Sequence, residues 1–251
     1  MRKWVVGVAV AVSVLSAVPS FALNPGGDVM VLPVIGRFAG AGGTQWRTDV
    51  YVSNPFSPTQ NVRLKFYRSG SAVLETTLTM GPFSSRTLPD IVLNTFGLDN
   101  AGGVLELLVE PGFTILARAV IYNSGNPAGQ FGQGVPGLAT RVLSRQAYLF
   151  GLSGIDGSRV NVGVTNPNDA PVEVSILVTD ENNNSLHSRT VTVAAHGNVQ
   201  YNDIFTTFGI APRAGVRVSM GTADVLIYGY SSEVRNDTGD AIFNFGTSPN
   251  N

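Results

Sequence analysis

Two stretches of this chain decide its fold: TDVYVSNPFSPTQNVRLKFY, residues 48–67, and VNVGVTNPNDAPVEVSILV, residues 160–178. In both, apolar residues alternate with polar ones on either side of an Asn-Pro pair, at Asn54-Pro55 and at Asn166-Pro167. Alternation with a period of two is typical of a β-strand with one buried face. Asn-Pro favours a turn, because Pro cannot donate to a β-ladder and Asn tolerates turn geometry. Each stretch therefore predicts two strands joined by a corner.

Further landmarks recur in the same order, which indicates an internal repeat. They are Asp90-Ile91 with Asp203-Ile204, Thr95-Phe96-Gly97 with Thr207-Phe208-Gly209, and Gly103-Val104 with Gly215-Val216. Each Asp is placed where a helix N-cap would lie, and Gly97 or Gly209 supplies a stop. One or two helical turns are therefore expected at residues 91–96 and 204–208, in two copies of one supersecondary unit.

Strands account for most of the remaining pattern in both copies. In the first copy they are expected at residues 29–35, 48–53, 61–67, 72–80, 86–88, 103–109 and 114–121. In the second copy they are expected at residues 146–151, 160–165, 172–178, 185–193, 199–201, 215–220 and 225–231. Many short alternating strands with Gly, Pro and Asn corners predict an all-β fold of two tandem immunoglobulin-like antiparallel β-sandwiches.

The predicted organisation is a signal peptide at residues 1–22, a first sandwich at 23–138 and a second at 139–251, joined near residues 138–141. Arg2 and Lys3 precede an apolar run, and Ser20-Phe21-Ala22 supplies a cleavage site. Cleavage after Ala22 would leave no integral membrane segment; a retained N-terminal anchor is the alternative. The Gly- and Pro-rich residues 125–137 are either a flexible linker or an ordered loop.

Composition excludes several classes of function. Removing Arg2 and Lys3 from the 16 basic side chains leaves 14 against 17 acidic ones, so there is no electrostatic footprint for nucleic acid. The chain has no Cys and therefore no disulfide or thiolate metal site. The predicted location, secreted or periplasmic, depends on the signal peptide alone.

The block WRTDVYVSNP (residues 46–55), Phe96-Gly97 some forty residues on, and a late GQFG (residues 129–132) resemble repeat domains of uncharacterised exported bacterial proteins. The resemblance implies immunoglobulin-like sandwiches of unassigned activity. The strand, Asn-Pro, strand element is also similar to bacterial adhesin and surface-array modules. The second copy departs from the block, since it has Asn161 in place of Asp49 and lacks the Trp. Nothing catalytic is implied.

The residues that could carry chemistry favour structural roles. Neither His187 nor His196 has a counterpart in the first copy, and no motif supplies a nucleophile or metal-ligand spacing around them. Asp90 and Asp203 fit helix caps better than a pair of glycosidase carboxylates. The chain is accordingly predicted to be no enzyme and to need no cofactor. Calcium stays an alternative at the oxygen-rich loops 180–184 and 236–240, although turn chemistry alone selects such residues.

Aromatic side chains offer one possible binding patch, made of Tyr228, Tyr230 and Trp46. Tyr228 and Tyr230 share one face of a predicted strand, and an exposed aromatic strip suggests sugar stacking or a protein interface. The leading hypothesis is a non-enzymatic structural or interaction protein that binds a protein or glycan at the cell surface, or a second copy of itself. Residues 23–31 would then be the donor strand for self-assembly. The alternative is a carbohydrate-binding module that uses the exposed aromatics.

Overall fold

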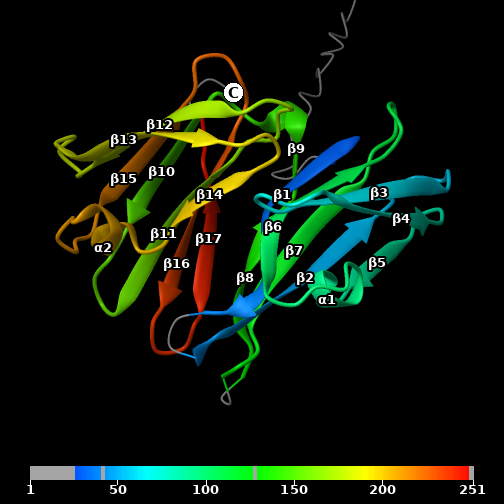
Figure 1. Cartoon of the computed structure of the whole chain (residues 1–251), viewed down its shortest axis with the longest axis horizontal. Helices are drawn as coiled ribbons and strands as arrows, with labels where there is room; N and C mark the ends of the chain where they lie inside the picture. The colour runs from blue at the N-terminus through cyan, green and yellow to red at the C-terminus, as the bar shows by residue number, and fades with distance from the viewer. Residues whose placement is uncertain (1–25, 41–42, 127–128, 249–251) are drawn as a thin grey trace, which may run out of the picture.

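The computed structural model describes residues 26–40, 43–126 and 129–248, and in this part of the chain the protein is all-β (Figure 1). Strand accounts for 56% of the structure and helix for 6%, which confirms the predicted class. The elements of the first unit are β1 (Val29–Ala39), β2 (Gln45–Ser53), β3 (Gln60–Tyr67), β4 (Leu74–Met80), β5 (Ser85–Leu88), α1 (Ile91–Asn94), β6 (Ala101–Leu108), β7 (Leu116–Asn123), β8 (Phe131–Pro136) and β9 (Leu138–Ala139). The elements of the second unit, after the 3-10 turn η2 (Thr140–Val142), are β10 (Gln146–Leu152), β11 (Ser158–Thr165), β12 (Val172–Thr179), β13 (Ser185–Val193), β14 (Asn198–Tyr201), α2 (Ile204–Phe208), β15 (Val216–Gly221), β16 (Tyr228–Arg235) and β17 (Ala241–Phe245).

Strand pairing in the first unit follows two antiparallel orders, which are joined by the pairing of β1 with β2. One order is β4-β3-β6-β1 and the other is β5-β2-β7-β8. Most of β1 pairs with β6, while its last residues Phe38 and Ala39 pair with Trp46 and Gln45 of β2. The β1–β6 register shifts between Leu32 and Ile35, where Pro33 cannot donate to the ladder. All nine strands of this unit therefore belong to one continuous sheet.

The second unit repeats these orders strand for strand. Its two sheets are β13-β12-β15-β10 and β14-β11-β16-β17, each of four antiparallel strands. The first strand again carries a register shift, between Leu149 and Leu152, beside Gly151 with φ 72°. The molecule therefore has three antiparallel sheets, and the repeated sequence landmarks occupy matching places in the strand orders.

The Asn-Pro corners are held by buried asparagine side chains. The amide of Asn54 donates to the carbonyls of Pro58 (2.8 Å) and Gly81 (2.9 Å), and its Oδ1 accepts from the N–H of Phe56 (3.1 Å) and from Nε2 of Gln60 (2.9 Å). Both Asn54 and its repeat Asn166 have no solvent exposure. One side chain thus ties the β2–β3 corner to the β4–β5 loop.

Asn166 holds the equivalent corner of the second unit in the same way. Its amide donates to the carbonyls of Ala170 (2.8 Å), Val193 (3.2 Å) and Ala194 (3.0 Å), and its Oδ1 accepts from the N–H of Asn168 (3.0 Å). Burying a polar side chain costs free energy unless its hydrogen bonds are made inside the protein, as they are here. The asparagine of each Asn-Pro pair therefore stabilises its corner through side-chain hydrogen bonds.

The predicted helix caps need a correction. Asp90 and Asp203 occupy the N-cap positions of α1 and α2, but both have left-handed backbone (φ 40° and 44°), and neither side chain makes a capping hydrogen bond. Their backbone N–H groups instead donate to side chains of the neighbouring strand, Asp49 Oδ1 (2.8 Å) and Asn161 Oδ1 (3.0 Å). Asp49 and Asn161 thus have the same role in the two units, since each accepts a hydrogen bond from the residue that precedes the helix. Helix α2 has its predicted bounds, whereas α1 ends two residues early.

Buried side chains of the described residues form three clusters: the core of the first unit, which also takes in Val234 and Ala241 of the second unit, the core of the second unit, and a third cluster between the units. The third contains Val31, Val104, Leu138, Leu143, Tyr228 and Tyr230. Strand β16 contributes to this cluster and is buried at Tyr228, Gly229, Tyr230, Ser231 and Ser232 in succession. Such a run means that the β14-β11-β16-β17 sheet is covered on both faces, by its own unit on one side and by the first unit on the other (Figure 1).

The described part of the Gly-rich segment at residues 125–137 contains a strand. Residues 131–136 form β8, which pairs with β7 from Asn123↔Phe131 to Arg118↔Pro136 and packs beside β17 of the second unit. The sequence patterns predicted neither β8 nor its counterpart β17. The ordered-loop interpretation is the one supported, and the segment contributes a strand.

The N-terminal residues do not form a free donor strand. Met30 and Val31 are fully buried, pair on one side with Leu107 and Glu106 of β6, and pair on the other side with β9. Donating this segment to another copy would remove a strand from the centre of its own sheet. The predicted signal peptide and its cleavage site lie outside the described residues. No helix in the described ranges is long and apolar enough to cross a membrane.

Candidate functional site

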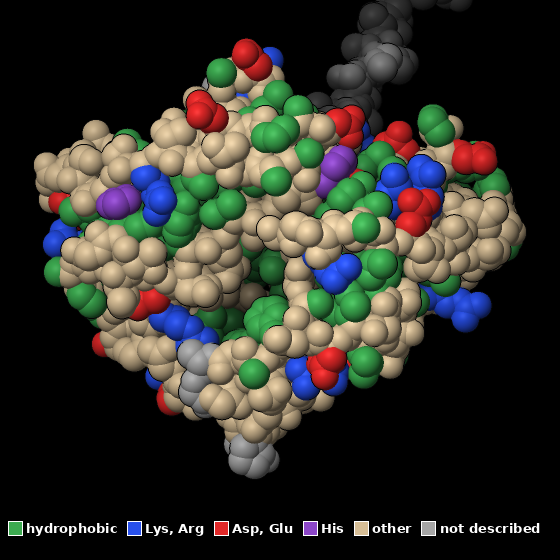
Figure 2. All heavy atoms as spheres, viewed as in Figure 1, with side chains coloured by type: hydrophobic (Ala, Val, Ile, Leu, Met, Phe, Trp, Pro, Cys, Tyr) green, Lys and Arg blue, Asp and Glu red, His purple; other side chains and the backbone are tan. Residues whose placement is uncertain are grey.

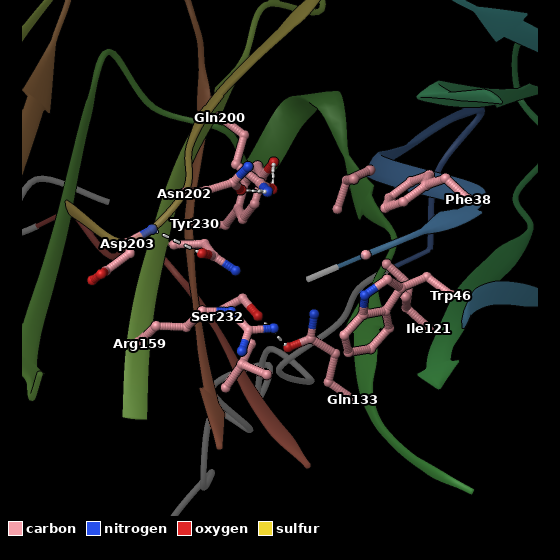
Figure 3. Close-up of a pocket in the computed structure, with 14 residues that line it drawn as sticks. Phe38, Trp46, Ile121, Gln133, Arg159, Gln200, Asn202, Asp203, Tyr230 and Ser232 are labelled. Atoms are coloured by element: carbon pink, nitrogen blue, oxygen red, sulfur yellow. Dashed lines mark hydrogen bonds between the residues drawn. The ribbon is translucent and has the colours of Figure 1, made fainter. Parts of the chain in front are cut away.

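A cavity of about 320 Å³ lies between the two units, and Figure 2 shows its mouth as a hollow at the centre of the molecule. Residues from β1, β2, β7 and β8 form one wall, and residues from β11, β14, β16 and the loop before α2 form the other (Figure 3). This volume is near the lower end of the ~300–1,000 Å³ range of small-molecule sites. The cavity is therefore a site that neither unit could form alone.

The wall from the first unit is mainly apolar and aromatic. It consists of Val34, Phe38, Gly40, Trp46, Ile121 and Gln133. Trp46 is the second residue of β2 and lies on the same face as Val50, so its indole belongs to the core of the first unit as well as to the cavity wall. A Cβ at Gly40 would lie 2.4 Å from Nε1 of Trp46, so a residue without a side chain is needed there for the indole to take this place. Gln133 of β8 supplies a polar group on this wall.

The wall from the second unit is mainly polar. It consists of Arg159, Asn161, Gln200, Asn202, Asp203, Tyr230, Ser232 and Val234. In β11, Val160, Val162 and Val164 belong to the core of the second unit, so the alternation of the strand turns Arg159 and Asn161 the other way, into the cavity. The two walls thus differ in character: apolar surface on one side faces amide and charged groups on the other (Figure 3).

A hydrogen-bond network fixes the polar wall. The hydroxyl of Tyr230 donates to Oε1 of Gln200 (2.9 Å) and accepts from Nδ2 of Asn198 (3.0 Å), and Nε2 of Gln200 donates to Oδ1 of Asn202 (2.7 Å). The ring of Tyr230 stacks on Phe243 at 5.2 Å. Burial raises the pKa of Tyr230 well above its usual value, so the phenol stays neutral and able to donate. The wall is therefore held in place before any ligand arrives.

The two charged residues of the cavity have opposite signs. Burial lowers the pKa of Arg159 below its usual value, while the charge of Asp203 acts in the opposite direction. Nη1 of Arg159 donates to Oδ1 of Asn236 (2.6 Å), and Oδ2 of Asp203 accepts from Oγ1 of Thr206 (2.5 Å). The remaining guanidinium nitrogens and Oδ1 of Asp203 have no hydrogen-bond partner among the described residues. The guanidinium of Arg159 therefore adds hydrogen-bond donors to the cavity, whereas the carboxylate of Asp203 points away from it (Figure 3).

Amide groups add further donors. Oε1 of Gln133 accepts from Oγ of Ser232 (2.8 Å) across the two walls. Oδ1 of Asn161 accepts from the N–H of Asp203, and Oδ1 of Asn202 accepts from Nε2 of Gln200. Within the described residues, the amide nitrogens of Gln133, Asn161 and Asn202 have no hydrogen-bond partner. These three donors come from both walls and are available to a bound molecule.

The predicted aromatic patch is only partly brought together. Trp46 and Tyr230 line the same cavity, although 184 residues of chain separate them, and Tyr228 does not line it. Tyr228 and Tyr230 share a strand face as predicted, but they are 1% and 0% exposed, so the expected exposed strip is not there. The first unit covers that face, and the hydroxyl of Tyr228 donates to the carbonyl of Pro136 in β8 (2.8 Å). Tyr228 is thus part of the contact between the units.

His196 also contributes to the contact between the units. Its Nδ1 lies 2.8 Å from Oε1 of the buried Glu106 in β6, its Nε2 lies 2.9 Å from Oδ1 of Asp169, and its ring stacks on Tyr67 at 4.4 Å. An imidazole that carries a proton on both nitrogens would donate to both carboxylates. No local sequence signal links His196 to Glu106, because 90 residues separate them.

The remaining candidates lie apart from one another. His187 stacks on Phe208 at 4.2 Å within the second unit. Asp90 pairs with Arg37 and lies 3.8 Å from Nε of Arg47 in the first unit, whereas its repeat Asp203 lines the cavity. The two repeated acids therefore do not face each other across a cleft.

The oxygen-rich loops use their oxygens for turn geometry. Oδ1 of Asp180 accepts from the N–H groups of Asn182 (3.0 Å) and Asn184 (2.8 Å), and Oδ1 of Asn183 accepts from Arg217. In the second loop, Oδ1 of Asp237 accepts from the N–H of Thr238 (3.0 Å). Among the described residues, no group of three or more His, Asp or Glu side chains is placed to hold a metal ion.

Comparisons with known proteins add little to this site. No family model matches the chain, and no curated protein matches it. Among solved structures, the chain is similar to the Pleurotus ostreatus lectin in its apo form, with 11% identity, a TM-score of 0.20, and coverage of 89% of this chain and 77% of that chain. A likeness this weak carries no argument about fold or function.

Proposed function

We propose that this chain is an exported, non-enzymatic interaction protein that binds its ligand in the cavity between two tandem immunoglobulin-like sandwiches. The matching strand orders of the two units support the tandem arrangement. The charged N-terminus, the apolar run and Ser20-Phe21-Ala22 support export to a secreted or periplasmic location. The ligand is a protein or glycan that meets the chain at the cell surface.

The cavity is the single observation that carries this proposal. It is lined by aromatic side chains on one wall and by convergent hydrogen-bond donors on the other, which is the composition of a small-molecule or side-chain recognition site. Its groups are held by contacts within the protein, such as those of Tyr230 with Gln200 and Asn198. Binding of a ligand would therefore require little ordering of the protein.

Tryptophan fluorescence gives a direct test, because Trp46 lines the cavity and Trp4 is the other tryptophan of the chain. In the full chain carrying Trp4→Phe, Trp46 is the sole reporter. A panel of soluble glycans and short peptides is titrated while the emission of Trp46 is recorded. We expect at least one ligand class to give a saturable shift that Gln133→Ala weakens and that the exposed-strand control Asn61→Ala leaves unchanged. The proposal fails if no ligand shifts the emission, or if binding is insensitive to Gln133→Ala.

A further inference from the structure

We propose that the cavity binds a carboxylate joined to a small apolar group, and that Arg159 holds the carboxylate; this rests on the proposed function above. Arg159 lies in β11, and its side chain extends into the cavity toward Gln133 of the opposite wall (Figure 3). Among the described residues, its guanidinium has one hydrogen bond, from Nη1 to Oδ1 of Asn236 (2.6 Å). Nε and Nη2 are left, and these two nitrogens form the side-on fork that can donate to both oxygens of one carboxylate.

The first unit shows what the guanidinium of Arg159 lacks. Strand β2 has the place in the first unit that β11 has in the second, and Arg47 stands at the position of Arg159. Nε of Arg47 lies 3.8 Å from Oδ2 of Asp90. The corresponding acid of the second unit is Asp203, but its Oδ2 accepts from Oγ1 of Thr206 (2.5 Å), and its carboxylate points away from the cavity (Figure 3). In the described part of the chain, no acidic side chain forms an ion pair with Arg159. The second unit thus leaves the carboxylate position beside this arginine to a ligand.

Partial burial increases what Arg159 gains from such a ligand. Loss of hydration lowers the pKa of Arg159, and the more distant charge of Asp203 offsets this only in part. Electrostatic attraction is stronger where water is partly excluded, so a carboxylate beside this guanidinium is bound more tightly than one beside an exposed arginine. The cavity therefore favours a ligand with one negative charge.

The amide groups of the cavity favour the same kind of ligand. Oε1 of Gln133 accepts from Ser232, and Oδ1 of Asn161 accepts from the N–H of Asp203. Their amide nitrogens have no hydrogen-bond partner among the described residues, so both side chains offer donors to the cavity. A carboxylate only accepts hydrogen bonds, whereas a sugar hydroxyl also brings a donor that needs an acceptor of its own. A group that only accepts is therefore the better match.

The opposite wall defines the rest of the ligand. Val34, Phe38, Trp46 and Ile121 present apolar surface there. Inorganic phosphate or sulfate would leave this surface in contact with water, whereas an apolar group attached to the carboxylate would cover it. A volume of about 320 Å³ is near the lower end of small-molecule sites and suits one ring or one branched side chain. A small aryl or alkyl acid has this chemistry, and so does the C-terminus of a peptide that ends in an apolar residue.

The experiment compares acids with their neutral amides on the full chain carrying Trp4→Phe, by the fluorescence of Trp46 and by isothermal calorimetry. One pair of probes is phenylacetate and phenylacetamide. The other is a short peptide ending in phenylalanine, with its C-terminal carboxylate free or amidated. We expect saturable binding of an acid, with its amide at least tenfold weaker, because the amide cannot form the charge-assisted pair. Binding of phenylacetate alone supports the inference with a small acid as the ligand, and binding of the free-ended peptide supports it with a protein C-terminus.

Variants of Arg159 test whether this residue holds the carboxylate. Arg159→Gln removes the charge, so it should weaken acid binding at least tenfold and abolish the preference for acid over amide. Arg159→Lys keeps the charge without the fork and should retain part of that preference. The matched control is Arg63→Gln, at an exposed arginine of β3, which should bind as the parent chain does. Thermal unfolding shows whether each variant is folded, and the comparison of acid with amide on the parent chain needs no variant.

The outcomes distinguish this inference from the proposed function. Equal binding of acid and amide, or a preference for the acid that persists in folded Arg159→Gln, would overturn the inference. Failure of both pairs, while a glycan or another peptide binds with sensitivity to Gln133→Ala, would also overturn it and leave the proposed function standing. Binding of none of these probes and of no member of that wider panel would overturn both.

Discussion

Replacing Asn54 by Ala should destabilise the chain far more than an ordinary surface substitution. The change removes four hydrogen bonds and leaves the carbonyls of Pro58 and Gly81, the N–H of Phe56 and Nε2 of Gln60 without that partner. Each buried polar group left unpaired costs ~1–3 kcal/mol. Some of these groups lie near the surface of the loop and can recruit water, so we expect a loss of about 3–4 kcal/mol in the free energy of unfolding.

Urea unfolding followed by circular dichroism measures this loss, and the repeat supplies an internal replicate. Asn166→Ala should cost a similar amount, because Asn166 makes a similar set of bonds in the second unit. The two sites share no partner, so the double variant should show the sum of the two losses to within ~0.5 kcal/mol. Asn182→Ala, in an exposed turn, should change stability by less than ~0.5 kcal/mol. If the free energy of unfolding falls by less than about 1 kcal/mol in both Asn54→Ala and Asn166→Ala, these side chains do not stabilise the corners as described.

Three further substitutions probe other parts of the structure. Burial raises the pKa of Glu233, so the folded chain holds the carboxyl proton more tightly than the unfolded chain does. Ionisation of Glu233 therefore costs stability as the pH rises from 4.5 through the raised pKa. Glu233→Gln should raise the melting temperature at pH 7 and flatten its dependence on pH across that window, and an unchanged pH profile would contradict this. His196→Ala should cost about 2 kcal/mol in urea unfolding, because it removes the imidazole that pairs with the buried Glu106, whereas Asp169→Ala, at a fully exposed carboxylate, should leave stability unchanged. Gly163→Ala would place a Cβ 2.2 Å from Cζ of Tyr230, so it should lower stability by ~1–3 kcal/mol and alter the near-ultraviolet circular dichroism of the tyrosines; an unaltered spectrum would mean that the ring is not held there.

The all-β class could be predicted from sequence, because it depends on local patterns. Alternation in residues 48–67 and 160–178 reports which side chains are buried within a unit, and the Asn-Pro pairs mark the corners. Strand β8 was missed because FGQGVP has few apolar residues and no clear apolar–polar alternation, so its pairing with β7 leaves no local sequence signal. The caps failed for a related reason: the sequence shows an Asp before an apolar run but not the left-handed backbone that turns its side chain away.

The candidate site could be predicted only in fragments. Trp46 and Tyr230 were singled out as aromatics, but nothing local shows that one cavity brings them together. Alternation placed Tyr228 and Tyr230 on one strand face without revealing that another unit covers that face. Part of the polar wall could have been predicted from the sequence. Arg159 and Asn161 alternate with the core residues Val160, Val162 and Val164, so their side chains must face away from the core. The wall that faces them is set by the packing of the first unit against the second, and no local sequence pattern predicts that packing.

Because the β14-β11-β16-β17 sheet is covered on both faces, the two halves of this chain depend on each other. Cutting between residues 138 and 141 and parting the halves would expose the rings of Tyr228 and Tyr230, which have almost no contact with water in the intact molecule. Calorimetry of the whole chain should accordingly show one heat-absorption peak rather than two, since neither half keeps its core closed after the other has melted. The two halves, although similar in strand order, are therefore expected to unfold as one unit.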